Sequence, residues 1–271
     1  MRIDASTKLY GIIGRPVGHS LSPAMHNAAF EHLGINAVYL AFETDSPERV
    51  MVAVRTLGIR GLSVTVPNKE TVMDFLDETD ETARQIGAVN TVKNLDGRLY
   101  GINTDWIGAV EALKAETDIR GRTVVVLGAG GSARAVAFGL AREGARVHIA
   151  NRTVEKARKL AREFGCTFSG LRDLPQVEGA ILVNTTSVGM GSLAGISPVP
   201  EEELDGFSLV MDIVYGREQT RLLKDAESRG CRIIQGTEML LHQAASQFEF
   251  WTGRQAPVEV MKKALMDAMS I

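Results

Sequence analysis

The sequence predicts an α/β protein with two parts, an N-terminal α/β domain and a second domain built on a doubly wound parallel sheet. Two observations predict this class. Short apolar runs alternate with helical patterns along most of the 271 residues, which is typical of strands joined by crossover helices. A glycine-rich turn, Gly128 to Gly131, lies between a β-branched apolar run and a helical pattern, as in parallel sheets that bind nucleotides.

The first predicted strand covers 9–13, and the loop after it contains Ser20 and Ser22. Ser22 suits the N-cap of a helix that runs to about Leu33, because Pro23 fits the first helical position. Two hydroxyl groups beside the positive end of a helix form a suitable site for a small carboxylate. For Ser22, a plain capping role is the alternative.

The alternation continues through a strand, a helix and a third strand, at 37–43, 46–58 and 61–66. Pro67 and the residues after it predict another helix, with Lys69 in its first turn. The helix dipole disfavours a cation at that position, so we expect Lys69 to have a chemical role, polarising a carbonyl or carrying a proton. A solvated surface lysine is the alternative.

Between 88 and 103 the pattern changes to two alternating runs around Asp96-Gly97, a strong β-hairpin signal, with Asn90 in the first arm. The second arm leads to Asp105, after which a helix with one apolar face is predicted. Asp105 is either the N-cap of that helix or a carboxylate that faces a cleft. A polar segment at 117–122 then suits a hinge into the second domain.

The glycine-rich turn belongs to one predicted βαβ unit, with strands at 123–127 and 146–150 around a helix at 132–143. Its glycines allow the backbone to approach a pyrophosphate, and the helix N-terminus supplies free N–H groups. Ala133 occupies the third position of the G-x-G-x-x-G/A pattern of Rossmann domains.

The residues after the second strand of this unit predict NADP rather than NAD as the cofactor. An NAD enzyme usually has an acid about twenty residues after the glycines to hold the ribose hydroxyl, but this chain has Asn151-Arg152-Thr153 there. The guanidinium of Arg152 suits a phosphate, and Lys156 follows within one helical turn. A solvated surface arginine is the alternative for Arg152.

The rest of the chain completes the sheet and returns to the first domain. We expect a helix to about Phe164, then strands at 180–183, 208–213 and 232–234, with the loop 184–190 and Tyr215 at carboxyl ends, where such sheets bind ligands. A helix at 237–251 carries Gln243, a substrate ligand or an ordinary solvated glutamine, and a last helix covers 258–269. The predicted domains are 1–104 for substrate, 105–236 for the nucleotide, and 237–271 as helices packing on the first domain.

Composition excludes several classes of function. The chain is 23% charged and 45% hydrophobic with a formal net charge of -3, so it has no basic excess for nucleic acid. Its two cysteines, Cys166 and Cys231, show no metal-ligand spacing, and we expect no metal. No apolar run approaches a membrane span and no signal-peptide core follows Met1, so we expect a cytoplasmic protein without a membrane partner.

Seven stretches carry a resemblance to the shikimate dehydrogenase family, in that family's order and across nearly the whole chain. They are His19 to Pro23 with His26-Asn27, Val64 to Pro67 with Lys69, Gly87 to Thr91, Asn103 to Asp105, the Gly128 to Ala135 loop, Asn151 to Thr153, and Gln235-Gly236 with Gln243. The resemblance implies NADPH-dependent reduction of 3-dehydroshikimate to shikimate, a step of chorismate and aromatic amino-acid biosynthesis, by a monomer or homodimer.

The resemblance also assigns roles to residues. It implies that Ser20 and Ser22 hold the substrate carboxylate, that Lys69 and Asp105 are catalytic, and that Tyr215 lies near the substrate. The ring hydroxyls fall to Thr65, Asn90, Asp105 and Gln243. The cofactor residues are Gly128, Ala129, Gly130, Gly131, Ser132, Ala133, Asn151, Arg152, Thr153, Lys156, Thr186, Gly236 and Met239.

The chain departs from the family pattern at two positions. Ser63 replaces a common asparagine, which alters a supporting hydrogen bond. Lys156 replaces a common arginine, which loosens the expected hold on the 2′-phosphate. The nearest alternative is a quinate/shikimate dehydrogenase with broader substrate or NAD use, against which Arg152 argues. A nucleotide-binding regulator without turnover predicts the loss of Lys69 or Asp105, and both are present.

Overall fold

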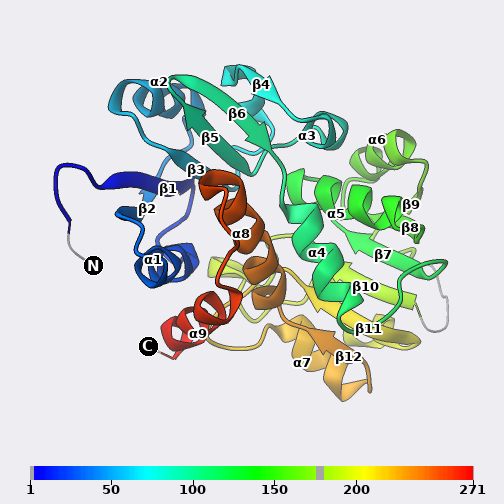
Figure 1. Ribbon diagram of the computed structural model, residues 1–271. Coiled ribbons are helices and arrows are strands. Elements are labelled where there is room, and N and C mark those ends of the chain that lie inside the picture. Colours follow the sequence, from blue (N-terminus) through cyan, green and yellow to red (C-terminus); the bar gives the residue numbers. More distant parts are fainter. Residues whose placement is uncertain (1–2, 175–179, 271) are drawn as a thin grey trace. The chain divides into compact units, whose positions relative to one another are not determined.

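The computed structural model describes residues 3–174 and 180–270 (Figure 1). The chain divides into two compact units. Unit 1 consists of Met1–Thr104 and Gln243–Ile271, and unit 2 of Asp105–His242. Unit 1 is therefore assembled from both ends of the chain, and unit 2 is the continuous segment between them.

Unit 1 contains a mixed sheet with the strand order β2-β1-β3-β5-β6-β4. β1 pairs in parallel with β2 and β3, whereas β5 is antiparallel to both β3 and β6. The predicted hairpin is thereby confirmed: β5 and β6 flank Asp96 and Gly97, which have φ angles of 50° and 92°. The strands are β1 (Lys8–Gly14), β2 (Ala37–Glu43), β3 (Gly61–Val64), β4 (Glu78–Thr79), β5 (Thr91–Leu95) and β6 (Arg98–Ile102).

Helices cover both faces of this sheet. On one face, Met51 and Val54 of α2 join Leu62 and Val64 of β3 in an apolar core. On the other face the core is aromatic: Tyr10 packs against Phe30, with ring centroids 5.1 Å apart, and against Trp251, at 5.5 Å. The helices of this unit are α1 (Ser22–His32), α2 (Pro47–Leu57), α3 (Glu81–Ile86), most of α8 (Gly236–Thr252), and α9 (Val258–Met269), which packs against α1.

Gly61 explains how α8 approaches the sheet so closely. A Cβ atom at this position would lie 2.5 Å from the indole nitrogen of Trp251, so only glycine leaves room for the ring. The same indole N–H donates a hydrogen bond to the carbonyl of Val92, at 2.9 Å. The C-terminal part of the chain is therefore fixed to the centre of the unit 1 sheet.

Unit 2 contains a sheet with the order β12-β11-β10-β7-β8-β9, in which the recorded strand pairs are all parallel. This order reverses direction between β7 and β10, which is the Rossmann arrangement and the point where such sheets bind nucleotides. The strands are β7 (Thr123–Leu127), β8 (Arg146–Ala150), β9 (Thr167–Ser169), β10 (Ala180–Asn184), β11 (Phe207–Asp212) and β12 (Arg232–Ile234), and the helices are α4 (Asp105–Lys114), α5 (Gly131–Arg142), α6 (Val154–Phe164) and α7 (Arg221–Ser228).

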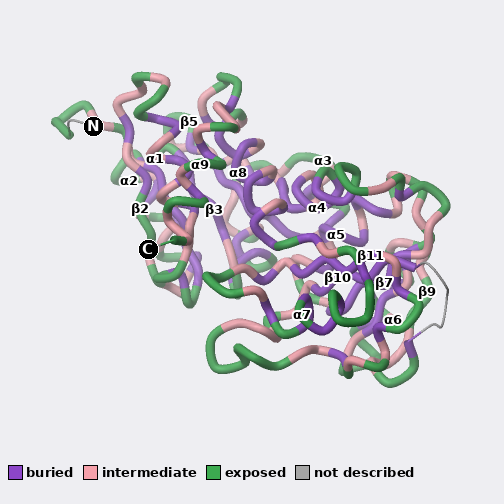
Figure 2. The backbone as a smooth tube through the Cα atoms, turned by 90° about the horizontal axis from the view of Figure 1, so that it is seen from below, coloured by how far each residue is buried: buried purple, intermediate pink, exposed green. Residues whose placement is uncertain are grey.

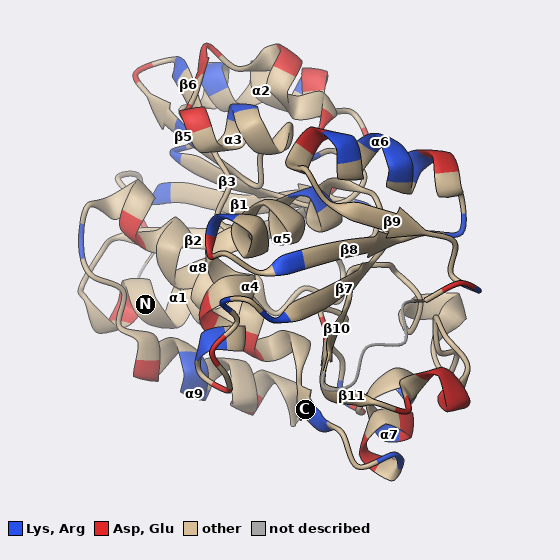
Figure 3. Cartoon of the chain, turned by 90° about the vertical axis from the view of Figure 1, so that its right-hand side faces the viewer, with Lys and Arg blue, Asp and Glu red and all other residues tan. Residues whose placement is uncertain are grey.

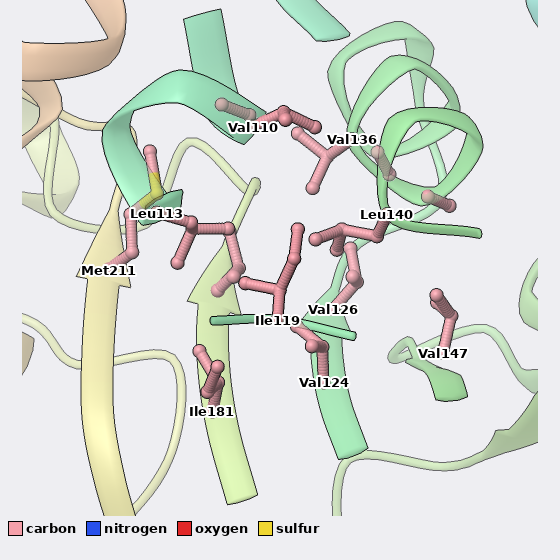
Figure 4. Close-up of a cluster of buried hydrophobic side chains, with 14 of the residues drawn as sticks. Val110, Leu113, Ile119, Val124, Val126, Val136, Leu140, Val147, Ile181 and Met211 are labelled. Atoms are coloured by element: carbon pink, nitrogen blue, oxygen red, sulfur yellow. The ribbon is translucent and has the colours of Figure 1, made fainter. Parts of the chain in front are cut away.

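Apolar side chains fill both faces of this sheet, which explains the continuous apolar runs in the sequence. Figure 4 shows one face, where Val110 and Leu113 of α4 and Val136 and Leu140 of α5 point toward Val126 and its neighbours. The alternate residues of β7, including Val125, contribute to a second core with α7 on the other face. The central strands β7 and β10 are accordingly buried along almost their whole length in Figure 2. The predicted α/β fold class is confirmed.

One predicted element is wrong. No α-helix begins at Pro67; residues 66–70 form turns, and a 3-10 helix follows at Thr71–Phe75. The N–H of Asn68 donates to the Thr65 carbonyl at 2.9 Å, and the Asn68 amide donates to the Thr44 carbonyl at 3.0 Å. This contact with the end of β2 is a tertiary interaction that the local proline signal does not report.

Candidate active site

The residues predicted to bind ligands form two groups, one in each unit. In unit 1 they lie where several strands end at the same edge of the sheet. Val64 of β3 pairs beside Ile13 of β1, so Thr65 leaves the sheet beside the loop that follows β1. Because β5 is antiparallel to β3, its amino end lies at this same edge. The N–H of Val64 accordingly donates to the carbonyl of Asn90, at 2.7 Å.

Gly14 lets the serine loop pack against Thr65. A Cβ atom at Gly14 would overlap the methyl group of Thr65 and lie 2.7 Å from the carbonyl oxygen of Val66. The Thr65 N–H also donates to the carbonyl of Ile13, at 2.9 Å. The start of the loop that carries the two predicted carboxylate-binding serines is therefore held directly beside Thr65.

Both serines lie at the N-terminus of α1, but their local roles differ from the prediction. The helix begins at Ser22 itself, and Leu21 occupies the capping position, so the predicted N-cap role of Ser22 is wrong. The Ser20 hydroxyl instead accepts a hydrogen bond from the Ser22 N–H, at 3.3 Å. Leu21 already has a helical backbone conformation, and its carbonyl accepts a hydrogen bond from the Met25 N–H, at 3.4 Å. Two hydroxyl groups still lie at a positive helix end.

Lys69 is buried, with 9% of its surface exposed, so the alternative of a solvated surface lysine is wrong. Its backbone carbonyl accepts a hydrogen bond from the N–H of Val89, at 2.8 Å. This bond fixes the lysine turn to the residue before Asn90. Burial of an ammonium group is costly unless it interacts with other polar groups, which is typical of a lysine with a chemical role.

Asn90 is the centre of the unit 1 group. Its side-chain oxygen accepts hydrogen bonds from the Thr104 N–H at 2.8 Å and the Thr91 hydroxyl at 2.7 Å. Its amide group donates to the Thr104 hydroxyl at 2.9 Å and to the side-chain oxygen of Gln243 at 3.4 Å. Gln243 is buried, so the alternative of an ordinary solvated glutamine is wrong. The structure thus brings together Asn90 and Gln243, which are 153 residues apart in sequence.

Asp105 belongs to unit 2 and is the first residue of α4. It is buried, with 4% of its surface exposed. A carboxylate in the first turn of a helix interacts favourably with the helix dipole. The position is compatible with a structural role in the first turn and with the catalytic role implied by the resemblance.

The glycine-rich turn of unit 2 lies at the switch point between β7 and β10. Gly128 has a φ of +115°, and a Cβ atom there would lie 2.6 Å from the hydroxyl of Thr185, in the loop after β10. α5 begins at Gly131 with Gly130 as its N-cap, and no side-chain hydrogen bond caps it. Ala133 is buried in the core, as close packing of this helix on the sheet requires. A turn of this shape fits a pyrophosphate.

The cations predicted to bind a 2′-phosphate follow β8. Arg152 and Lys156 are both exposed, and neither forms an ion pair within residues 3–174 and 180–270. Glu155, between them, pairs instead with Arg158. Asn151 donates from its side chain to the Thr153 carbonyl, at 3.0 Å, which orders the segment. Figure 3 shows Lys and Arg along α6, which begins here. Two cations without a carboxylate partner suit a phosphate.

A buried carboxylate that the sequence analysis missed orders the next loop. Asp212, the last residue of β11, accepts hydrogen bonds from the Asn184 amide at 2.9 Å, the Val214 N–H at 3.0 Å and the Thr220 hydroxyl at 2.7 Å. Burial raises the pKa of Asp212 to about 6, although these three hydrogen bonds act to lower it. Asn184 accepts from the hydroxyl of Thr186, at 2.7 Å, so the network holds a predicted cofactor residue.

The remaining predicted residues lie near the ends of β11 and β12. Tyr215 is partly buried and follows Val214, whose N–H is bound to Asp212. A Cβ atom at Gly236 would lie 2.5 Å from the carbonyl oxygen of Ile213, so glycine allows the start of α8 to approach the end of β11. Met239 is packed in the core of unit 2. No local sequence pattern marks Asp212, because its side-chain partners Asn184 and Thr220 lie outside its own strand.

Family models and a curated relative match most of the chain that carries these residues. Three family models match: the shikimate dehydrogenase substrate binding domain over residues 12–92, shikimate/quinate 5-dehydrogenase over 110–188, and the shikimate 5′-dehydrogenase C-terminal domain over 236–266. The NADP(+) shikimate dehydrogenase of Pyrococcus abyssi is 48% identical over 264 residues, covering 97% of this chain and 98% of that protein.

Solved structures of shikimate dehydrogenases are also similar to this chain over nearly its full length. A shikimate dehydrogenase in complex with NADP+ has a TM-score of 0.91 and 44% identity, covering 98% of this chain and 97% of that one. The shikimate 5-dehydrogenase of Thermus thermophilus, in complex with NADP(H) and shikimate, has a TM-score of 0.88 and 40% identity, covering 97% of this chain and 100% of that one.

Proposed function

The chain belongs to the shikimate dehydrogenase family, and we propose that it reduces 3-dehydroshikimate reversibly to shikimate with NADPH, using Lys69 and Asp105 as its proton relay. The observation that carries the activity is the match over nearly the full length to NADP(+) shikimate dehydrogenases. The reaction is a step in aromatic amino-acid biosynthesis.

The residues of unit 1 support this assignment as substrate ligands. We assign the carboxylate of the substrate to Ser20 and Ser22, where two hydroxyl groups and the positive end of α1 coincide. The ring hydroxyls fall to Thr65, Asn90 and Gln243, which supply both donors and acceptors. Tyr215 of unit 2 is assigned to the substrate as well, by family resemblance.

NADPH fits the residues of unit 2. The turn after β7 and the N-terminus of α5, where the N-cap residue is Gly130, would hold the pyrophosphate, while Arg152 and Lys156 would hold the 2′-phosphate. Thr186, Gly236 and Met239 complete the proposed set. When bound, NADPH supplies the hydride for the ring carbonyl carbon.

Side chains of the protein, and not the cofactor, transfer the proton. Negative charge grows on the carbonyl oxygen as its carbon is reduced, and an ammonium group at Lys69 stabilises that charge and donates a proton. Asp105 accepts a proton in the reverse direction or holds the substrate hydroxyl.

A second candidate is a quinate/shikimate dehydrogenase of broader specificity, which the family name matched over residues 110–188 also covers. An assay of NADP reduction with shikimate, then with quinate, and then with NAD in place of NADP separates the candidates. Fast NADP reduction with shikimate alone supports the biosynthetic enzyme. Comparable rates with quinate or NAD support the broader one, and no turnover would refute both.

The proposal also covers the location, the oligomeric state and the partners of the enzyme. Among the described residues, no helix is long and apolar enough to cross a membrane. We propose a cytoplasmic monomer or homodimer that acts on a small molecule and has no nucleic-acid partner, since the net charge of -3 offers no basic surplus.

A further inference from the structure

A chain of buried hydrogen bonds runs across unit 1 and ends at Asn90. The Tyr39 hydroxyl donates to the Ser63 hydroxyl at 2.6 Å, and Ser63 donates to the side-chain oxygen of Gln247 at 2.7 Å. The amide group of Gln247 then donates to the backbone carbonyl of Asn90, at 3.2 Å. None of these four residues has more than 4% of its surface exposed. The chain connects β2, β3, α8 and the start of β5.

The direction of these bonds fixes the amide of Gln247. If the amide were turned over, its oxygen would face the Asn90 carbonyl oxygen and leave two buried acceptors opposed. The Ser63 hydroxyl would then face the amide nitrogen of Gln247 and would have to turn its own hydrogen toward Tyr39, which reverses the observed chain. In the observed orientation, both ends of the Gln247 amide therefore meet complementary buried partners.

Gln247 and Gln243 lie one turn apart on the same face of α8 and both contact Asn90. Gln247 binds its backbone carbonyl, and Gln243 accepts from its side-chain amide. The carbonyl of Asn90 also accepts from the N–H of Val64, at 2.7 Å. Asn90 is therefore held between β3 and two turns of α8.

We propose that Gln247 is a positioning residue for the substrate, which holds Asn90 and Gln243 in their ligand-binding orientation and is itself oriented by Ser63 and Tyr39. The proposal rests on the proposed function, in which Asn90 and Gln243 bind the ring hydroxyls. A loss of orientation weakens contacts made by bound substrate and leaves the nucleotide residues of unit 2 unchanged.

The test compares variants that differ only in the hydroxyl groups. Ser63→Thr retains the hydroxyl, and Ser63→Val has the shape of that threonine with a methyl group in place of the hydroxyl. Tyr39→Phe removes the other hydroxyl, and Tyr10→Phe is its control, because Tyr10 is the buried partner of Tyr39 in the β1–β2 register and lies outside the chain of hydrogen bonds. KM and kcat are measured for shikimate and for NADP.

Ser63→Val and Tyr39→Phe should each raise the KM for shikimate by about threefold to tenfold, the usual worth of one hydrogen bond, with KM for NADP unchanged. Ser63→Thr and Tyr10→Phe should stay near wild type. Gln247→Met should have the largest effect of the series, and the double variant of Ser63→Val and Tyr39→Phe should be less than multiplicative, because both interrupt one chain.

Equal KM values for Ser63→Thr and Ser63→Val, together with an unchanged Tyr39→Phe, would overturn the positioning role. If a Ser63 variant fails to fold, the comparison of Tyr39→Phe with Tyr10→Phe decides, and if a tyrosine variant fails to fold, the comparison of Ser63→Val with Ser63→Thr decides. Asn90→Ala separates the two proposals. If it raises the KM for shikimate while Ser63→Val, Tyr39→Phe and Gln247→Met leave that KM unchanged, the positioning role alone is refuted. An unaffected Asn90→Ala, or a wild type without turnover on shikimate, refutes the proposed function instead.

Discussion

The backbone carbonyl of Lys69 accepts a hydrogen bond from the N–H of Val89, 2.8 Å away, so the turn that carries the lysine is fixed to the segment that carries Asn90. Asn90 in turn is held by Thr104 and Gln243. The proposed catalytic lysine and the proposed substrate ligands of unit 1 therefore share one hydrogen-bonded framework. Changes to the lysine side chain should affect chemistry without disturbing that framework.

Replacing Lys69 by alanine should lower kcat by about 10²-fold to 10⁴-fold and change the KM for shikimate far less, because the proton is transferred and the charge develops only in the transition state. Steady-state kinetics in the direction of shikimate oxidation measure both constants. Lys8→Ala, at an exposed lysine of β1, is the control. A normal kcat with a raised KM would show that Lys69 only binds substrate.

Replacing Arg152 by alanine should weaken NADP binding by about tenfold to a hundredfold, the worth of a hydrogen bond to a charged group, and leave NAD binding unchanged. Titration calorimetry with each nucleotide gives the two dissociation constants. Arg158→Ala is a matched control, since Arg158 lies on the same helix but pairs with Glu155. An unchanged preference for NADP in Arg152→Ala would remove the 2′-phosphate assignment.

Asp212 should make the protein less stable as the pH rises from about 4 to about 7. Its pKa is raised from 3.8 to about 6 by burial, so its favourable contribution is complete below pH 4 and is lost as the carboxyl ionises through pH 6. Asp212→Asn should therefore gain about 3 kcal/mol relative to wild type across this interval. Urea unfolding at several pH values measures the difference; parallel curves for the two proteins would contradict it. The exposed Asp267→Asn is the control.

His26 should have the opposite effect. Its ring is fully buried and stacks on Tyr39, with centroids 4.5 Å apart, and within the described residues neither ring nitrogen has a hydrogen bond of normal geometry. Burial lowers the pKa of His26 to about 3, and the nearby Gln247 amide opposes this shift only in part. The neutral ring is stabilising above pH 6.5, and this stability is lost as the pH falls toward 3.

His26→Phe should remove that acid sensitivity. Between pH 7 and pH 4 the variant should gain about 3 kcal/mol relative to wild type in urea unfolding. His32→Phe, at the exposed end of α1, is the control. A constant difference between His26→Phe and wild type over this range would show that the ring is hydrated or protonated in the folded protein.

The elements that the sequence predicted well are those specified by local signals. The strand at Thr123–Leu127, the turn at Gly128 and the hairpin around Asp96 were predicted because apolar runs and glycines with positive φ mark them directly. The turn around Lys69 was predicted wrongly because the Asn68 amide donates to the carbonyl of Thr44, in the loop that follows β2. A single sequence carries no sign of that partner.

The site residues likewise divide into those that sequence or family resemblance indicates and those that only tertiary contacts reveal. Asn90 and Gln243 were proposed from resemblance, and their contact depends on α8 returning to the sheet of unit 1. The networks around Asp212 and Gln247 were not predicted, because each joins residues from strands or helices far apart in the chain. Buried polar partners of this kind are fixed by the assembled fold, which periodicity and propensity do not describe.

The discontinuity of unit 1 has a consequence for synthesis on the ribosome. Unit 2 is a continuous segment, so all of its strands are available once His242 has left the ribosome. Unit 1 at that moment still lacks Trp251, whose ring packs on Tyr10, and lacks α9, which packs on α1. The N-terminal segment of unit 1, Met1–Thr104, therefore reaches its final packing last. Truncation of Gln243–Ile271 would leave its strands without Trp251, which packs on Tyr10.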